Sequence, residues 1–485
     1  MNVLIYFLDE LRADVLGCYG HPFVRTPAMD AIASSGMRFD AAYSNCPLCM
    51  PARMSFFTGR YPSEHGVLFN GNVKEVQHGY DGDPALFAFG AMLRDAGFRR
   101  VINVGKHHTG FTPEISGFTE HVPAPDGRGA KPPKEPEGTA GDAHVVKIPG
   151  VPPNTILGGT YPGDGSDSHP AIAADRAIEV LETLAGEEDP WLLRVSINAP
   201  HTPVMPPAPY DTMYQEQNAS WEPDPGEVER RTPMLGRMNK LRGFSDISLA
   251  DQRWARTCYH GLTTFVDAQI GRIQSQVERL GLGDDLLTIV ISDHGASIGD
   301  HGQQVKGPFD TDDIARIPLV IRGPGVQSGT YAPIVQIIDA LPTLGSLIGR
   351  GRWKEEADAT CDGASTGGGA ATSEAPLYSG RSLADVLGGR REPVHDAVFS
   401  EGEFPNIHPG QRQSVRTEEW LYTRYPELDE EELFDLQTDP EQTTNVAVSN
   451  PEVVAELNTA IDAWKREHGE RVAISVGAVS LKKTH

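Results

Sequence analysis

The chain has 485 residues, and 42 Lys and Arg against 67 Asp and Glu leave a formal net charge of −25. This length suits about three domains, or one large domain with a smaller partner. So acidic a chain excludes a general attraction to nucleic acid or anionic lipid, and an anionic substrate would need locally concentrated positive charge. No apolar run approaches the ~18 residues of a membrane span, the N-terminus has no basic leader, and the five cysteines are an odd number. We therefore expect a cytoplasmic protein without a disulfide framework and without a nucleic-acid or membrane partner.

Apolar runs predict the strands of an α/β sheet. The first run, residues 3–8, is apolar without alternation, which is typical of a strand buried on both faces of a parallel sheet. A helix is predicted from Thr26-Pro27 to Gly36, with Pro in its first turn and Gly past its end. The other elements expected are strands at 101–104, 191–197, 286–291 and 317–321, and helices at 172–184 and 259–280. Strands that alternate with helices predict a sheet covered on both faces.

The later part of the chain changes character. Residues 119–170, rich in Pro and Gly, predict a surface insertion, and residues 356–376 predict a flexible loop. Short strands are expected at 397–399, 420–422 and 432–436. A helix should follow Asn450-Pro451, with apolar positions Val453, Leu457, Ala460, Ile461 and Trp464. We expect a catalytic domain over residues 1–385 and a smaller α+β subdomain over 386–485.

Polar side chains follow four of the predicted strands. These clusters are Asp9-Glu10, Lys106-His107-His108, His201 and Asp293-His294. Ligands of open α/β sheets bind beyond the carboxyl ends of the strands, so the four clusters should share one rim. Carboxylates with at most one imidazole favour Ca²⁺, Mg²⁺ or Mn²⁺ over Zn²⁺. Taken singly, Asp9-Glu10 is also compatible with a helix cap and Asp293-His294 with a turn.

The segment Cys46-Pro-Leu-Cys49-Met-Pro51-Ala-Arg53 has two interpretations. Its C-x-x-C spacing suits a redox or metal half-site, but no second C-x-x-C exists to complete a zinc cage. Alternatively, Pro51 opens a helix and Cys49 lies just before it, where unpaired N–H groups stabilise an anion. Arg53 would then lie about one turn on, on the same face. A buried cysteine beside a surface arginine is the plain structural alternative.

Here the sequence resembles a family. Cys49-Met-Pro-Ala-Arg53 is similar to the C-x-P-x-R signature of type I sulfatases, in the alkaline phosphatase superfamily. Further similar segments follow in the family's order through most of the chain: Thr26–Asp30, Thr58–Val67, Gly105–Gly110, Pro200–Pro203, Ser292–Gly307 and Glu432–Asn445. The resemblance implies an α/β fold, with a large mixed, mostly parallel sheet sandwiched by helices and a smaller C-terminal subdomain.

The resemblance also implies the chemistry. A formylglycine-generating enzyme would oxidise Cys49 to an aldehyde, which hydrates to a gem-diol. One hydroxyl would attack sulfur, and the other would later expel the sulfate by collapsing to the aldehyde. The substrate would be a small anionic sulfate ester. One divalent metal is implied, with Ca²⁺ as the first expectation and Mn²⁺ or Mg²⁺ as alternatives.

Residue roles follow from the same resemblance. The metal ligands would be Asp9, Glu10, Asp293, His294 and the oxygen of residue 49, although Glu10 departs from the family's second Asp. Arg53 and Lys106 would hold residue 49, and His108 would be the base for the second hydroxyl. His201 and Lys306 would bind the sulfate oxygens and protonate the leaving oxygen. His107 and His301 are expected as neighbours, and Asn70 and Asn72 either reach the pocket or cap a loop.

Three functions remain open at this stage. The first is hydrolysis of a sulfate ester, and the closest rival is hydrolysis of a phosphonate monoester or phosphate diester in the same superfamily. The third is a metal-binding protein without catalysis, which requires that Cys49 stays a thiol. The organic part of the substrate would be chosen by segments such as 119–170 and 205–245. A homo-oligomer is left open by the sequence.

Overall fold

A large mixed sheet forms the centre of the computed structural model, which describes residues 1–71, 87–124, 144–148, 155–224, 226–361, 377–405 and 408–469. Its eight strands lie in the order β12-β2-β11-β8-β1-β7-β3-β4. Their bounds are β1 (Asn2–Asp9), β2 (Met37–Tyr43), β3 (Arg100–Gly105), β4 (Glu120–Val122), β7 (Trp191–Pro200), β8 (Leu286–Ser292), β11 (Arg316–Arg322) and β12 (Gly329–Gln336).

The four strands that end in polar clusters are neighbours. β8, β1, β7 and β3 lie side by side and pair in parallel, so their carboxyl ends meet at one edge. The unbroken apolar run of β1 is buried from Val3 to Asp9, as expected for a strand covered on both faces. β11 runs antiparallel to β8 and to β2, which makes the sheet mixed. The predicted fold class is confirmed.

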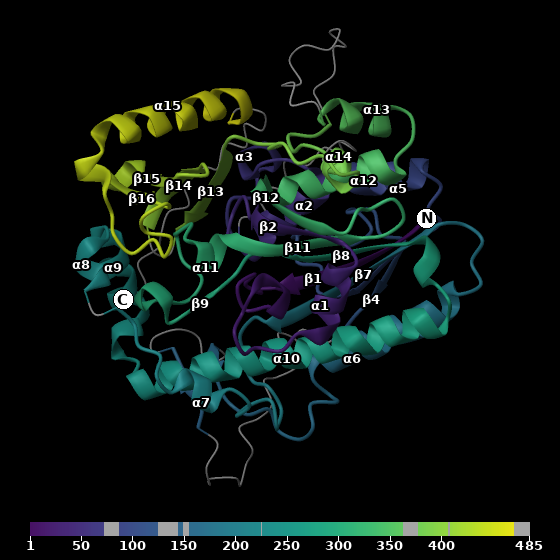
Figure 1. The fold of residues 1–485 in the computed structure, drawn as a ribbon, viewed down its shortest axis with the longest axis horizontal. Helices are drawn as coiled ribbons and strands as arrows, with labels where there is room; N and C mark the ends of the chain where they lie inside the picture. Colours follow the sequence, from purple (N-terminus) through teal and green to yellow (C-terminus); the bar gives the residue numbers. More distant parts are fainter. Residues whose placement is uncertain are drawn as a thin grey trace.

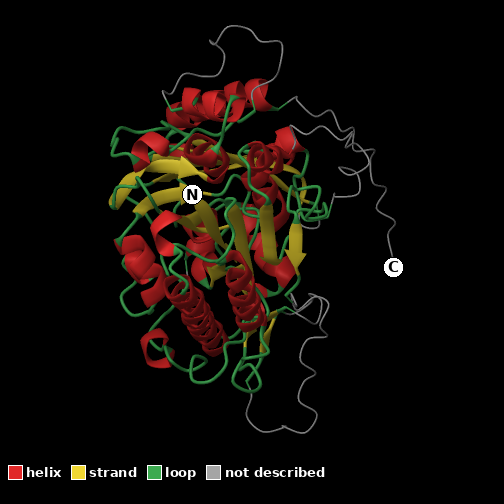
Figure 2. Ribbon diagram, turned by 90° about the vertical axis from the view of Figure 1, so that its right-hand side faces the viewer, coloured by secondary structure: helices red, strands yellow, loops and turns green. Residues whose placement is uncertain are grey.

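Helices cover both faces of this sheet (Figures 1 and 2). One layer contains α1 (Pro27–Ser34), α6 (His169–Leu184) and α10 (Leu249–Arg279). The other contains α2 (Cys49–Thr58), α3 (Pro62–His65), α5 (Ala88–Asp95), α12 (Ala340–Ile348), α13 (Arg352–Ala359) and α14 (Ala384–Leu387). Alternate residues of β1 enter two separate cores: Val3, Ile5 and Phe7 face the second layer, and Leu4, Tyr6 and Leu8 face the first.

Two elements differ from the sequence-based expectation. α10 begins at Leu249 rather than near Tyr259, because Ser248 caps it and accepts a hydrogen bond of 3.1 Å from the Asp251 amide. β2 was not predicted. Its charged residues Arg38 and Asp40 interrupt the apolar pattern, and they pair with each other at 2.8 Å.

A separate antiparallel sheet lies near the C-terminus. It contains β13 (Val398–Phe404), β14 (His408–Arg416), β15 (Trp420–Tyr425) and β16 (Glu430–Asp435), and α15 (Pro451–His468) packs on it. The ring of Trp464 on α15 stacks on Phe399 at 5.1 Å. Leu457 and Ile461 of the same apolar face are also buried, while Val453 and Ala460 are half-buried. β14, which the sequence did not predict, pairs with both β13 and β15.

The remaining elements are short. They are β5 (Val146–Lys147), β6 (Ile156–Gly158), α7 (Gln215–Asn218), α8 (Glu227–Arg230), α9 (Pro233–Arg242), β9 (Ser297–Ile298), β10 (Gln304–Val305) and α11 (Asp312–Ala315). Of the predicted insertion at 119–170, residues 125–143 and 149–154 lie outside the described residues; in the described part β4 joins the main sheet and β5 pairs with β6. Of the predicted loop at 356–376, residues 356–359 belong to α13 and 362–376 lie outside the described residues. None of the described helices combines the length and apolarity that crossing a bilayer requires.

Candidate active site

The carboxyl ends of the four central strands bring the predicted clusters together. Asp9 ends β1, Asp293 follows β8, and Lys106 follows β3. His201 follows β7, and its amide donates to the Asp9 carbonyl at 3.1 Å. Ligand atoms of Asp9, Cys49, Asp293 and His294 all lie within 4.8 Å of one another, and all four residues are buried. A site that draws on positions 9 to 294 exists only because the parallel strands end together.

Cys49 is the first residue of α2, so the helix begins two residues earlier than predicted and Leu48 is its N-cap. The Pro51 signal placed the helix correctly, but Pro is tolerated throughout the first turn, where no intrahelical N–H bond is lost. Cys49 therefore still lies at the positive end of the helix dipole. Its side chain is fully buried, with Sγ 3.2 Å from Lys306 Nζ and 3.3 Å from His294 Nε2.

Arg53 lies one turn further along α2 and is also fully buried. It donates through Nη2 to Asp9 at 2.8 Å and through Nε to Asp293 at 2.9 Å, and its Nη1 donates to Ser196 Oγ at 3.0 Å. Lys106 pairs with the same carboxylate of Asp9. Arg53 thus ties both acids to the helix that carries Cys49. The alternative of a surface arginine is wrong.

Positive charge dominates the surroundings of residue 49. Burial alone would raise the pKa of the Cys49 thiol, but Lys306, Lys106 and His294 together hold this pKa well below its usual range. His108 adds a hydrogen bond to the same side chain. Burial and the neighbouring Cys49 would raise the pKa of Asp9, and Lys106, His201 and Arg53 hold it below its usual range. An anionic atom at position 49 is therefore strongly stabilised.

The donor set suits one divalent cation. Arg53 takes Oδ2 of both Asp9 and Asp293, so Oδ1 of Asp9 faces Cys49 Sγ at 3.6 Å. The Nδ1 atom of His294 lies 2.7 Å from the Gly295 carbonyl, and its Nε2 atom is directed at the cluster, 3.3 Å from Cys49 Sγ. Two carboxylates, one imidazole and the side chain of residue 49 are a donor set for a hard cation.

Glu10 takes a different direction from Asp9. Its backbone is in the left-handed region, with φ of 62°, and its amide donates to Asp293 Oδ1 at 3.1 Å. Its carboxylate pairs with Lys306 and lies 3.5 Å from His201 Nε2. Asp9, Glu10 and His201 form a second group whose ligand atoms lie within 4.8 Å of one another. In this arrangement Glu10 connects the two sulfate-binding candidates, and its role as a metal ligand stays a prediction.

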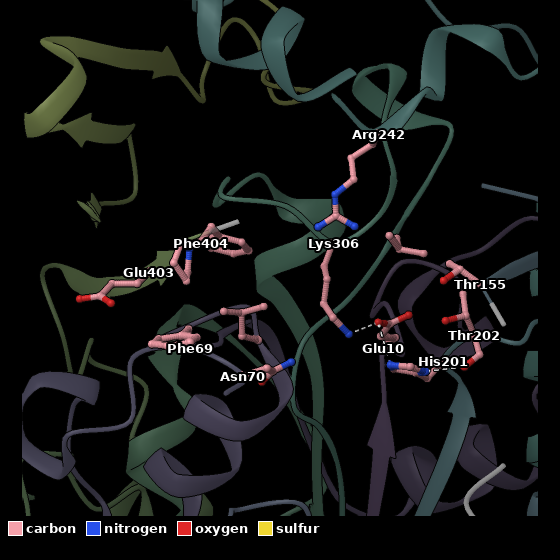
Figure 3. A pocket seen from close by; sticks show the side chains of 13 residues that line it. Glu10, Phe69, Asn70, Thr155, His201, Thr202, Arg242, Lys306, Glu403 and Phe404 are labelled. Carbon is pink, nitrogen blue, oxygen red and sulfur yellow. Dashed lines mark hydrogen bonds and ion pairs between the residues drawn. The ribbon is translucent and has the colours of Figure 1, made fainter. Parts of the chain in front are cut away.

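A pocket of about 230 Å³ opens beside this centre (Figure 3). Glu10, His201 and Lys306 form its inner end, next to the buried cluster. Its outer walls combine residues from separate parts of the chain: Leu48, Phe69, Asn70, Thr155, Thr202, Arg242, Val305, Glu403, Phe404 and Pro405. Thr155 and Arg242 come from the two segments that were expected to choose the organic part of the substrate.

Other candidates have structural partners. His107 Nε2 lies 2.8 Å from Ser116 Oγ, and its ring packs against Phe57 and Phe118, away from the pocket. His301 lies between Glu227 and Asp313. Asn70 lines the pocket and accepts a hydrogen bond of 2.9 Å from the Met50 amide, so it caps the first turn of α2 instead of a loop. Asn72 lies outside the described residues.

Four contributors were missed from sequence: Ser196, Phe69, Phe404 and Arg242. Ser196 lies within a predicted strand, where a polar residue could have been noticed. The other three gave no local signal, since single aromatic or basic residues are common in loops and at helix ends.

Comparisons with known proteins agree with this geometry. A family model described as Sulfatase matches residues 1–350. The protein is 27% identical to a choline-sulfatase of Rhizobium meliloti (strain 1021), over 93% of this chain and 83% of that one. It is 25% identical to an arylsulfatase of Clostridium perfringens (strain 13 / Type A), over 92% and 90% of the two chains. A crystal structure of the phosphonate monoester hydrolase of Agrobacterium radiobacter superposes with a TM-score of 0.71 at 25% identity, covering 96% of each chain.

Proposed function

The chain belongs to the sulfatase family and is a sulfuric ester hydrolase, and from this premise we propose that it cleaves a small organic sulfate ester in the pocket beside Cys49. One observation carries the proposal: Asp9, Asp293 and His294 surround the fully buried side chain of residue 49. Lys306 reaches the same atom from the pocket side at 3.2 Å. A sulfate group at the inner end would therefore contact both the side chain of residue 49 and the ammonium group of Lys306.

We propose that Asp9, Asp293 and His294 hold one divalent cation, with Ca²⁺ expected ahead of Mn²⁺ or Mg²⁺, and with residue 49 completing the shell. When bound, the cation lowers the pKa of a neighbouring hydroxyl and neutralises negative charge on the substrate. Arg53 and Lys106 keep the Asp9 carboxylate ionised, and Arg53 fixes the orientation of Asp293. Glu10 is proposed to orient Lys306 and His201 instead of supplying a primary ligand.

The remaining side chains divide the binding and proton transfers. Lys306 and His201 flank Glu10 at the inner end of the pocket, where they would donate to sulfate oxygens and deliver a proton to the leaving oxygen. His108 hydrogen-bonds the side chain of residue 49, which suits a base that removes a proton there. Cys49 itself would be converted to formylglycine by a formylglycine-generating enzyme, and this supplies the aldehyde chemistry of the family.

We also propose a division of labour along the chain. Residues 1–385 would supply all catalytic groups. Residues 386–485 would form a subdomain that shapes the wall of the substrate pocket. Support comes from the pocket, because Glu403 and Phe404 at the end of β13 line its outer wall.

A phosphonate monoester or phosphate diester is the second candidate substrate. It is favoured by the structural match to a phosphonate monoester hydrolase over nearly the whole chain. The Asp293-His294 pair does not distinguish the two candidate substrates, since a metal ion held by these ligands suits either anion.

The test compares an aryl sulfate with an aryl phosphonate on enzyme produced together with a formylglycine-generating enzyme. Mass spectrometry of the peptide containing Cys49 must first show loss of sulfur. We expect a higher kcat/KM for the sulfate. A clear phosphonate preference would replace the first candidate with the second. If Cys49 is fully converted and neither ester is hydrolysed, the remaining interpretation is a metal-binding protein without catalysis.

A further inference from the structure

The outer half of the pocket contains a cation that the proposed chemistry does not use. Arg242 is the last residue of α9, and Gly243, with φ of 67°, turns the chain away directly after it. Figure 3 shows its guanidinium pointing into the pocket, on the far side of the Lys306 side chain from Glu10 and His201. It is half-buried.

Within the described part of the chain, Arg242 forms no hydrogen bond and no ion pair. Arg237 on the same helix is nearly half exposed, and it still pairs with Glu430 at 2.7 Å. Burial lowers the pKa of the Arg242 guanidinium, and among the described residues no acid opposes that effect. Removing a cation from water without a partner is unfavourable, so this arrangement is most stable when an anion from outside the chain occupies the pocket.

The surroundings indicate how that anion is attached. Leu48, Phe69 and Phe404 offer an apolar wall in the same pocket. Figure 3 shows Phe69 and Phe404 on the opposite side of the Lys306 side chain from Glu10 and His201. A ring can pack against such aromatic side chains while its polar substituents reach both ends. The pocket of about 230 Å³ is smaller than the roughly 300–1,000 Å³ of sites for drug-sized ligands. It therefore suits one ring better than a chain of sugars.

Charge argues against a cationic organic part. Glu403 lines the outer wall, but Figure 3 shows its carboxylate directed away from Arg242 and from the centre of the pocket. Glu10 is already paired with Lys306. The charge that faces the outer space is that of Arg242.

We propose that Arg242 binds a second anionic group, a carboxylate or a sulfate, on the organic part of the substrate, and that the enzyme prefers small single-ring sulfate esters carrying such a group. This inference rests on the proposed function. The planar guanidinium can donate two parallel hydrogen bonds to either anion. Sulfate hydrolysis occurs at the inner end, and Arg242 recognises the far end of the same molecule.

The test uses two substrates that differ by one charge, 4-sulfooxybenzoate and its neutral carboxamide, with 1,4-phenylene bis(sulfate) to compare the two anion types. Converted wild-type enzyme should show a kcat/KM about tenfold or more higher for the carboxylate or the bis(sulfate) than for the amide, as a charge-assisted contact of about 1.5–3 kcal/mol allows. Arg242→Gln should remove this preference and leave the amide within about threefold. Arg242→Lys should keep part of it.

Lys240→Gln is the matched control. Lys240 lies in the same last turn of α9 and is exposed, so it tests loss of a charge near the helix end without loss of the contact. Both substrates should react with this variant as with wild type.

Binding is measured separately from turnover. Calorimetry on Cys49→Ala and on Cys49→Ala with Arg242→Gln gives the Kd of each protein for the carboxylate substrate and for the amide substrate. Equal Kd values, an equal loss of both substrates in Arg242→Gln, or a preference for choline sulfate would overturn the inference. Absence of turnover with a retained difference in Kd would instead overturn the proposed function alone.

Discussion

The inner end of the pocket and its outer wall are built in different ways. At the inner end and in the cluster behind it, each of these cations has a partner: the buried Arg53 pairs with two carboxylates, the buried Lys106 with Asp9, and the partly exposed Lys306 with Glu10. On the outer wall, Arg242 is half-buried and unpaired in the described chain. The strand ends supply the first region, whereas loops, α9 and the C-terminal sheet supply the second.

This difference indicates that the inner end carries out the reaction, whereas the outer wall selects the substrate. Charges that are buried and mutually paired are fixed before the substrate arrives, so they can stabilise a transition state without reorganisation. A lone cation on the wall gains its partner only from the substrate and so discriminates between substrates. Variants at the inner end should therefore affect every sulfate ester alike, in contrast to variants at Arg242.

The largest effect is expected from Cys49→Ala. Loss of the nucleophile position should lower kcat by at least about 10³-fold for all sulfate esters. The measurement is release of 4-nitrophenol from its sulfate. Cys46→Ala is the control, because Cys46 is equally buried but lies against Gly402 and Phe404, so near-normal turnover is expected. Turnover by Cys49→Ala within tenfold of wild type would refute the assignment.

Removal of the proposed cation should come next. Chelation, or Asp293→Asn, should lower kcat by about 10²–10³-fold, since a bound cation contributes several kcal/mol. Atomic emission should find one divalent ion per chain in wild type and much less in the variant. Asp267→Asn is the matched control: this buried carboxyl accepts hydrogen bonds from the amides of Ala28 and Met29 at the start of α1, and burial raises its pKa to about 7. If Asp293→Asn kept its metal, the ligand set would be wrong.

A uniform effect of about 10²-fold on kcat/KM is expected from Lys306→Gln, as for removal of one donor to a developing anion. The loss should be the same for the carboxylate and the amide of the substrate pair. Unequal losses would mean that Lys306 also takes part in selection, and the separation between the two regions would fail.

The smallest effect on activity, but a measurable one on stability, is expected from His301→Gln. Burial would lower the pKa of His301, yet Asp313 and Glu227 raise it to about 10. Because this lies above the unfolded value of about 6.5, the stabilisation is complete below about pH 6.5 and declines as pH rises towards 10. The variant should lose about 2 kcal/mol of unfolding free energy at pH 6 and clearly less at pH 9.

Urea denaturation at the two pH values checks this. His144→Gln is the control, because His144 pairs with Asp251 at 2.5 Å on the exposed surface, where such pairs contribute little. A loss for His301→Gln that did not change with pH would mean that His301 is neutral in the folded protein.

Much of the fold followed from local patterns. The unbroken apolar run of β1 and the mostly apolar runs of β7 and β8 mark strands buried on both faces, and Thr26-Pro27 marks the start of α1. β2 and β14 escaped prediction because their residues are only partly apolar, and the partners of β2, β11 and β12, are also distant in sequence. The early start of α10 depended on the Ser248 cap, a signal that was present and overlooked.

The sequence by itself determined that Asp9, Lys106, His201 and Asp293 share one rim, because these residues follow strands whose ends must meet in a parallel sheet. Only the tertiary structure decided the rest: that Glu10 turns towards Lys306, that His107 and His301 face other partners, and that Arg242 enters the pocket. The physical reason is that strand direction fixes where a strand ends, whereas the direction of a side chain in a loop or at a helix end depends on packing against distant segments.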